Sequence, residues 1–295
     1  MGFGIAVQAG SLHPVRMTFA RFLSAMALLG SALAGWSYWT AISDPIVRFV
    51  DVDILPADSR QQRLRILLLS DIHVAGPDMP PERLSRIVEQ ANAQKPDAIL
   101  IAGDFVSDKA LATRRFSLGE AVAPLHRLKS RFGTFAVLGN HDHWRKAAAA
   151  RGALLDIGIK VLNNSAARAG PLVIGGLDDA YTHHDDLDAT LRAMSDLGGV
   201  PLLLSHSPDP FPRVPAGVNL MLAGHTHCGQ IRLPLVGALS YMSEHGDRYA
   251  CGVVVERGRT LVVGAGLGTS LLPLRLGAVP DMWLITVKSR GARRR

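Results

Sequence analysis

Residues 64–73 read LRILLLSDIH, an apolar run that passes directly into a polar cluster at 70–73. An apolar run of this length, bounded by polar residues, is typical of a buried strand. Four later apolar runs also end in polar clusters: Gly103-Asp104, Gly139-Asn140-His141-Asp142, Ser205-His206 and Gly224-His225-Thr226-His227. Open α/β sheets gather their functional groups at the carboxyl ends of strands. The sequence therefore predicts one site assembled from five strand ends.

The segments between these strands predict an α/β fold. Helical periodicity covers residues 80–93 and 144–155, and a mostly helical stretch is expected up to residue 129. Near the end of the chain, apolar runs at 252–255 and 260–263 flank Glu256-Arg257-Gly258-Arg259, which predicts a hairpin. Early alternation of strands and helices followed by hairpins favours a mixed sandwich in which helices cover two sheets.

Seven residues of the polar clusters carry donor atoms for divalent metals. They are Asp71, His73, Asp104, Asn140, His206, His225 and His227. On an extended segment, the two members of each pair spaced two apart (71 and 73, 225 and 227) would leave the same face. Two carboxylates, one amide oxygen and four imidazoles suit Mn, Fe, Co or Zn better than Ca or a structural Zn.

The size of this set indicates two metal ions. Seven ligands exceed what one catalytic ion with an open position would take. They suit two ions ~3.5–4 Å apart that share a bridging carboxylate. The glycines at 103, 139 and 224 are expected to let the chain turn sharply beside the metals.

The ordered set D-x-H, GD, GNHD, H and GHTH resembles the calcineurin-like metallophosphoesterase superfamily, over residues 64–287. It is most similar to the membrane-associated bacterial branch that includes the YkuE and YaeI phosphoesterases. Two further stretches match this branch: GHTHCGQ at 224–230, and GLGTS at 266–270 followed by LPLR at 272–275. The resemblance implies a four-layer αββα sandwich, with two mixed sheets flanked by helices and an N-terminal transmembrane helix.

The resemblance also implies roles for the site residues. The first metal would be held by Asp71, His73 and His227, with Asp104 as the bridge. The second would be held by Asn140, His206 and His225. His141 would stand over the substrate, and Asp142 would orient it. As a hypothesis, a hydroxide that bridges the two metals would attack a phosphodiester or pyrophosphate, and His141 would protonate the leaving oxygen or stabilise the transition state.

The chain departs from the family pattern at two places. The family's Gly-Asp-x-x-Asp is replaced by Gly103-Asp104-Phe105-Val106-Ser107, with Asp108 one position late. Cys228 stands where glycine is common, and we expect it to fill a tight turn rather than to contact a metal. A disulfide between Cys228 and Cys251 is an open alternative for an exported domain.

The net charge of +7 lies in the two tails of the 295-residue chain. Arg16 and Arg21 are the only charged residues before Asp44. Residues 288–295 contain five basic residues and no acidic residue. Between Asp44 and Val287 the chain has 25 basic and 25 acidic residues. A neutral body argues against a nucleic-acid partner. A nuclease of the same superfamily and a metal-binding membrane protein without catalysis remain the alternatives to a membrane phosphoesterase.

Residues 22–43 contain no charged residue and are long enough to cross a bilayer. A membrane anchor is favoured over a signal peptide cleaved near Ala32-Leu33-Ala34 and over a buried helix, and Met17 is an alternative start. We therefore expect a cytoplasmic segment and anchor at 1–43, a linker at 44–63, the metallophosphoesterase domain at 64–287 and a basic tail at 288–295. Arginines before the anchor favour a bacterial inner-membrane protein with a periplasmic domain.

An anchor beside the catalytic domain predicts a phosphorylated substrate at the membrane. A nucleotide-linked lipid such as UDP-2,3-diacylglucosamine, from the lipid A pathway, is one candidate. That reaction would require a site on the cytoplasmic face, against the expected topology. Arg275 is a candidate phosphate contact, because a guanidinium pairs with two oxyanion oxygens at once.

Overall fold

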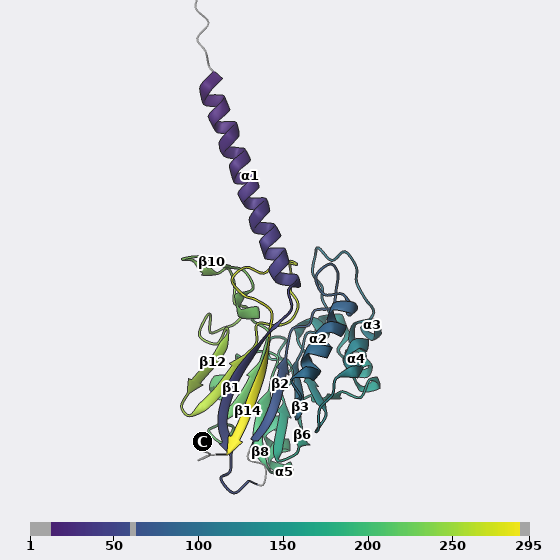
Figure 1. The fold of residues 1–295 in the computed structure, drawn as a ribbon. Helices are drawn as coiled ribbons and strands as arrows, with labels where there is room; N and C mark the ends of the chain where they lie inside the picture. Colours follow the sequence, from purple (N-terminus) through teal and green to yellow (C-terminus); the bar gives the residue numbers. More distant parts are fainter. Residues whose placement is uncertain (1–12, 60–62, 290–295) are drawn as a thin grey trace, which may run out of the picture.

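Two six-stranded sheets form the centre of the computed structural model, which describes residues 13–59 and 63–289 (Figure 1). The first sheet has the order β1 (Ile46–Leu55), β14 (Asp281–Ser289), β2 (Arg63–Leu69), β3 (Ala98–Ala102), β4 (Thr134–Val137) and β5 (Lys160–Val161). The second has the order β12 (Gly252–Glu256), β13 (Arg259–Val263), β9 (Leu220–Ala223), β8 (Val200–Leu204), β7 (Leu172–Gly176) and β6 (Ser165–Ala169). A small ribbon pairs β10 (Arg232–Leu233) with β11 (Gly237–Ala238).

Helices cover the outer faces of both sheets. The first sheet carries α2 (Pro81–Ala93), α3 (Leu118–Val122), the 3₁₀ turn η1 (Ala123–Arg127) and α4 (Asn140–Asp156). The second carries α5 (Leu187–Leu197) and the 3₁₀ turn η2 (Phe211–Arg213), and η3 (His227–Gly229) follows β9. This arrangement confirms the predicted αββα sandwich.

The side chains of β2 show why its sequence is almost wholly apolar. Leu64, Ile66 and Leu68 point into the core between the two sheets, whereas Leu67 and Leu69 point into the core under the helices. A strand that is buried on both faces cannot alternate between apolar and polar residues. The continuous apolar run that opens the domain therefore follows from its central place in the sandwich.

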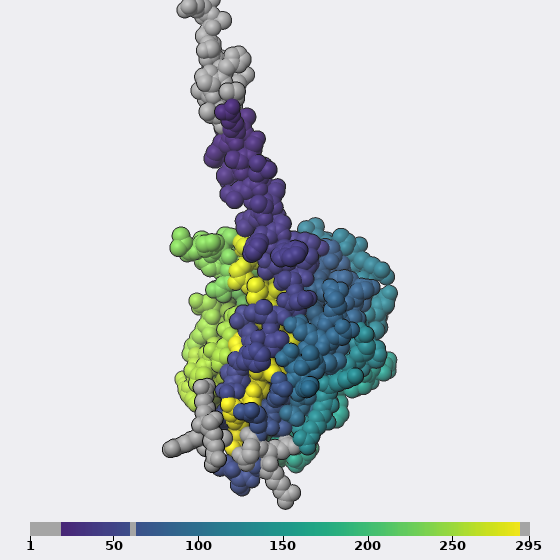
Figure 2. Space-filling model, viewed as in Figure 1, coloured from purple at the N-terminus to yellow at the C-terminus, as the bar shows by residue number. Residues whose placement is uncertain are grey.

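Helix α1 (His13–Ile42) stands away from the sandwich and joins it only at its carboxyl end (Figure 2). Side chains 19–36 are exposed, while Ser37, Thr40 and Ala41 are buried against the domain. The Arg275 backbone N–H donates to the Ser37 carbonyl at 2.9 Å, and the Arg83 guanidinium donates to the Ser43 carbonyl at 2.7 Å. Residues Phe19–Ile42 are long and apolar enough to cross a membrane. The exposed side chains exclude the buried-helix interpretation.

Strand directions place the strand-end site at the α1 end of the domain. β1 starts four residues after α1 and runs parallel to β14, whereas β14 is antiparallel to β2. β3 and β4 are parallel to β2. The carboxyl ends of β2, β3 and β4 therefore return to the end of the domain from which α1 emerges (Figure 1).

The predicted linker at 44–63 is wrong over most of its length, because it contains the edge strand β1. Val52 and Ile54 enter the core between the sheets, while Asp51 and Asp53 are exposed, as in a strand with one buried face. The predicted tail also begins two residues too early, since Lys288 and Ser289 belong to β14. Residues 290–295 and the predicted cytoplasmic residues 1–12 lie outside the described residues.

Candidate metal centre

The seven predicted ligands converge at the strand ends, and all of them are buried. In the first group, His73 Nε2 lies 3.0 Å from His227 Nε2. His227 Nε2 lies 3.5 Å from Asp71 Oδ1, and His73 Nε2 lies 3.4 Å from Asp104 Oδ2. The turns after β2, β3 and β9 thus bring four donor atoms close together.

The second group is centred on His206. Its Nε2 lies 3.0 Å from Asn140 Oδ1 and 3.1 Å from His225 Nδ1. The same Nε2 lies 3.4 Å from Asp104 Oδ2, which is also the distance from that oxygen to His73 Nε2. The Asp104 carboxylate therefore stands between the two groups and belongs to both.

The hydrogen bonds of His206 and His225 test whether these residues fit a metal. His206 Nδ1 lies 2.6 Å from the Ala102 carbonyl, and His225 Nε2 lies 2.8 Å from the Met242 carbonyl. A carbonyl can only accept, so these nitrogens carry the protons, and the opposite ring nitrogens face each other. These two nitrogens lie 3.1 Å apart, a spacing at which both can bind one cation. Ligands bound at about 2.1 Å from one ion lie about 3.0–3.4 Å from each other, so the residues present fit divalent metals.

The backbone at the site is strained in a repeated way. Five of the seven ligands have a positive φ, a conformation that L-residues adopt rarely: Asp71, His73, Asp104, His225 and His227. Such strain concentrates at functional sites, where the surrounding structure enforces it. The expectation of an extended 71–73 segment is therefore wrong, because β2 ends at Leu69 and the two ligands converge through a tight turn.

Two of the three glycines are needed for close approach rather than for turning. A Cβ at Gly139 would collide with the Asp104 carboxylate, and a Cβ at Gly224 would collide with the Asp71 carboxylate. Gly103 alone among the three has a positive φ, of 77°. Gly139 thus leaves room for a carboxylate from the turn after the neighbouring strand β3, and Gly224 for one from the turn after β2 in the other sheet.

Burial keeps three of the imidazoles neutral. It lowers the pKa values of His73 and His227 well below 6.5, and it lowers the pKa of His225 to about 3. Only a neutral imidazole has a lone pair to give to a metal. These three side chains are therefore neutral at pH 7 and ready to bind a cation.

Two further ligands, Asp71 and His206, hold protons that a metal must displace. Burial raises the pKa of Asp71 to about 7. Burial lowers the pKa of His206, but the nearby Asp104 carboxylate outweighs this effect and raises it well above 6.5. For Asp104, burial alone would raise the pKa, but the nearby His206 and His73 lower it well below 3.8.

We expect metal affinity to fall steeply below pH 7. Asp71 is protonated there in the folded protein, so an ion that binds in the first group must release at least one proton. The dissociation constant should therefore rise at least about tenfold per pH unit below 7 and level off as Asp71 ionises above 7. Titration of the metal-free protein with Mn²⁺ between pH 5.5 and 8.5 measures this slope. A pH-independent affinity would show that the buried proton is not displaced.

His141 faces the centre from the start of α4. Its ring lies edge-on to the His73 ring, with centroids 4.8 Å apart, and its Nδ1 lies 3.4 Å from Asp108 Oδ2. On its other side, Nε2 lies 3.4 Å from Ser270 Oγ. This places His141 where it can protonate a leaving group beside the metals. Sequence reasoning missed Asp108 as its partner, although the displaced aspartate of the 103–108 segment was the available signal.

Asp142 does not orient His141 as expected. Its buried carboxylate accepts the backbone N–H groups of Asp104, Phe105 and Gly139 at 2.9–3.0 Å. It therefore ties the turn after β3 to the start of α4 and fixes the position of Asp104. Asp142 is a positioning residue, since its donors are all main-chain groups of the ligand turns.

Arg275 does not face the substrate either, which corrects its assignment as a phosphate contact. Its side chain is fully buried. The guanidinium donates to the backbone carbonyls of Ala265, Gly268 and Ala278, at distances of 2.7–3.2 Å from Nη2, Nε and Nη1 respectively. Nη2 also lies 3.3 Å from His227 Nδ1. Arg275 therefore holds the 265–278 loop against the metal ligand His227.

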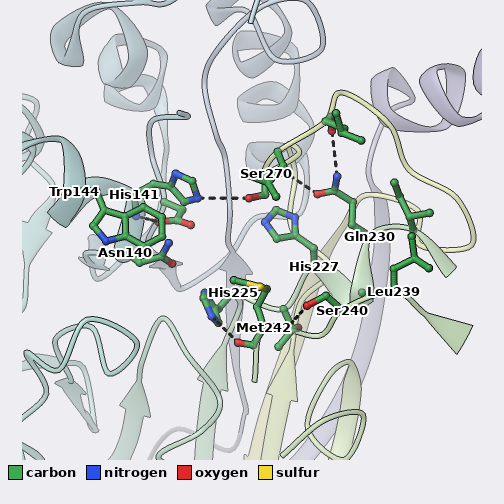
Figure 3. A pocket seen from close by; sticks show the side chains of 16 residues that line it. Asn140, His141, Trp144, His225, His227, Gln230, Leu239, Ser240, Met242 and Ser270 are labelled. Atoms are coloured by element: carbon green, nitrogen blue, oxygen red, sulfur yellow. Dashed lines mark hydrogen bonds between the residues drawn. The ribbon is translucent and has the colours of Figure 1, made fainter. Parts of the chain in front are cut away.

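A cavity of about 270 Å³ opens over the centre (Figure 3). Asp104, Asn140, His141 and His227 contribute its polar lining. Much of the remaining wall is apolar and comes from Trp144, Ile231, Leu239, Met242, Leu271 and Leu272. The cavity therefore joins a strongly polar floor to an apolar rim.

Cys228 follows the ligand His227 directly and forms a disulfide with Cys251, with Cα atoms 4.7 Å apart. The structure thus shows the disulfide that the sequence left open, and Cys228 is not a metal ligand. The bond ties the ligand turn after β9 to the segment that enters β12.

Comparison with known proteins places this geometry in a family. The model of the calcineurin-like phosphoesterase family matches residues 64–229. The Bacillus subtilis metallophosphoesterase YkuE is 33% identical over 233 residues, covering 76% of this chain and 79% of the relative. A Helicobacter pylori metallophosphoesterase is 28% identical over 293 residues, covering 95% and 75%. A Bos taurus transmembrane protein with a metallophosphoesterase domain is 30% identical over 291 residues, covering 91% and 63%.

These relatives share the domain that carries the buried histidines and aspartates at the strand ends. The matched region begins at β2 and ends just after the ligand His227, so it includes all seven ligands. The chain is therefore a hydrolase of the calcineurin-like metallophosphoesterase family.

Proposed function

We propose that the chain hydrolyses a phosphodiester or pyrophosphate bond at a centre of two divalent ions. The observation that carries this proposal is the Asp104 carboxylate, whose Oδ2 lies 3.4 Å from His73 Nε2 and from His206 Nε2. A carboxylate shared between two groups of ligands is what a dinuclear site requires. The donor set suits Mn, Fe, Zn or Co.

The residues around the centre have different roles in the reaction. When bound, the two ions lower the pKa of a water and neutralise charge on the phosphoryl oxygens. Asn140 and the histidines hold these ions, and His141 delivers a proton to the leaving oxygen. Asp108 Oδ2 lies 3.4 Å from His141 Nδ1 and can hold the ring in place. The apolar rim excludes bulk water from the reacting group.

Helix α1 supports a place at a membrane. Residues 19–36 are exposed and would span about 27 Å, close to the ~30 Å of a bilayer core. Trp36 and Trp39 are exposed near the carboxyl end of the helix, where an interfacial aromatic belt would lie. Relatives from Danio rerio and Bos taurus are named as transmembrane proteins. We infer that α1 anchors the domain and that its substrate is associated with the membrane.

The domain is best placed on the exported side of a bacterial inner membrane. Arg16 and Arg21 precede the apolar part of α1, which favours a cytoplasmic N-terminus. The disulfide between Cys228 and Cys251 also favours an oxidising compartment. Both observations disfavour UDP-2,3-diacylglucosamine as the substrate, because that lipid A precursor lies on the cytoplasmic face. Protease digestion of spheroplasts should cut the domain, whereas full protection would reverse this orientation.

The reaction class is tested with the full-length protein in phospholipid nanodiscs. The metal-free protein is supplemented with Mn²⁺, Zn²⁺, Co²⁺ or Fe²⁺ and assayed on phosphomonoesters, on bis-p-nitrophenyl phosphate and on UDP-linked lipids. We expect metal-dependent turnover of the diester or the pyrophosphate, and none after chelation. Binding of metal with no turnover of any of these compounds would contradict the proposal and favour a metal-binding protein without catalysis.

A further inference from the structure

The ribbon of β10 and β11 ends in an exposed apolar tip. Leu235 and Val236 form its turn; Leu235 is fully exposed and Val236 is 71% exposed. Strand β11 follows this turn, and the next residue, Leu239, is exposed and lines the cavity over the metal centre. Exposed apolar side chains that are contiguous with a binding cavity mark an interaction surface.

This tip lies at the end of the domain from which α1 emerges (Figure 1). The loop 270–276 connects the two features. Gln230 Nε2, beside the metal ligands, donates to the carbonyls of Leu272 and Leu274 at 3.1 Å. The Arg275 N–H then donates to Ser37 of α1 at 2.9 Å, next to Trp36. The cavity rim is therefore held at the level where α1 meets the domain.

We propose that the tip, Leu235 and Val236, inserts into the surface of the phospholipid bilayer that α1 crosses. The occupant of the apolar surface is then the bilayer, because α1 holds this end of the domain against it. Leu271, 65% exposed, and Leu272 continue the surface toward the metals. This inference rests on the proposed membrane anchor and deepens the proposed function.

The consequence concerns the class of substrate. A lipid phosphoester in the bilayer leaflet would reach the metals with its acyl chains against Leu239, Leu271 and Leu272 and its phosphoryl group on the polar floor. The cavity of about 270 Å³ holds a headgroup rather than whole acyl chains, so the chains stay in the membrane. The site therefore fits an amphiphile with its phosphoryl group at the lipid surface better than a soluble nucleotide.

The chain offers a matched control for this surface. Val255 is 67% exposed and lies at the end of β12, next to the hairpin at 257–258. β12 is antiparallel to β13, and β13 is parallel to β9, whose carboxyl end carries the metal ligands. Val255 is thus at the opposite end of the second sheet. It matches Val236 in side chain and exposure but lies at the end of the sheet opposite to the metal ligands.

The test places an environment-sensitive fluorophore at each valine. Val236→Cys and Val255→Cys, with the native disulfide intact, are labelled with NBD in full-length protein. Both are reconstituted in nanodiscs of phosphatidylethanolamine and phosphatidylglycerol, with and without 5-doxyl phosphatidylcholine. We expect blue-shifted emission and at least about twofold quenching by the doxyl lipid at 236, and neither at 255. Equal, weak quenching at both positions would overturn the proposal, and Leu235→Cys repeats the measurement one residue away.

Turnover of bis-p-nitrophenyl phosphate in the same samples separates this inference from the proposed function. This soluble diester does not need the membrane, so both labelled variants should hydrolyse it at the unlabelled rate. Turnover without quenching at 236 would refute membrane insertion and leave the phosphoesterase standing. Quenching without turnover of this diester, of phosphomonoesters or of UDP-linked lipids in the metal-supplemented samples would leave the membrane surface standing and refute the phosphoesterase.

Discussion

Asparagine in place of Asp104 is expected to weaken metal binding in both halves of the centre and to lower kcat/KM by at least about 10³-fold. The Asp104 Oδ2 is shared by the two ligand groups, so loss of its charge affects both ions. Asp104 Oδ1 accepts the backbone N–H of His141 at 2.9 Å. The amide oxygen of asparagine can accept the same N–H, so the turn itself should persist.

Metal content per chain, measured by mass spectrometry after dialysis, tests this expectation beside the kinetics. Asp281→Asn is the matched control, because it also removes a buried carboxylate charge, one that pairs with Arg48 rather than with the ligands. We expect the control to keep its metal and most of its activity. Wild-type metal stoichiometry in Asp104→Asn would show that this carboxylate does not bridge.

Alanine in place of His141 is expected to leave the metals in place and to lower kcat by about 10²–10⁴-fold. The ring faces the centre but its nitrogens lie near Asp108 and Ser270, so it is free to transfer a proton. The loss should be smaller for a substrate whose leaving group is a good one, such as p-nitrophenol, because that oxygen needs no proton. Steady-state kinetics on substrates with leaving groups of different pKa measure this dependence.

Ser270→Ala distinguishes this role from covalent catalysis. Ser270, His141 and Asp108 form a chain with 3.4 Å between each pair of atoms, which resembles the arrangement around a nucleophilic serine. Proton transfer from His141 predicts that Ser270→Ala keeps most of its activity. A loss as large as that of His141→Ala would instead favour Ser270 as the nucleophile and contradict the proposed mechanism.

The ligands were predictable because each one follows a strand that is buried on both faces. A run such as 64–69 stands out from its surroundings, and the polar residues after it mark the strand end. Parallel strands then bring these ends to one edge of a sheet. The sequence therefore identified the site without any knowledge of how the turns are built.

The roles of Arg275 and Asp142 were not predictable in the same way. Sequence position brings Arg275 close to the site, but only packing decides that its guanidinium lies under the 265–278 loop rather than in the cavity. The same holds for Asp142 and Asp108. Which of the two carboxylates contacts His141 depends on the start of α4 and on the loop after β3. Strand β1 was missed because its aspartates made the 44–63 segment look like a linker.

Electron paramagnetic resonance of the Mn²⁺-loaded, full-length protein tests the central claim most directly. Two ions that share Asp104 would lie ~3.5–4 Å apart, close enough for their spins to couple. We predict two Mn²⁺ per chain, with a coupled signal that disappears in Asp104→Asn. One Mn²⁺ per chain, or two with the spectrum of isolated ions, would contradict a dinuclear centre at these strand ends.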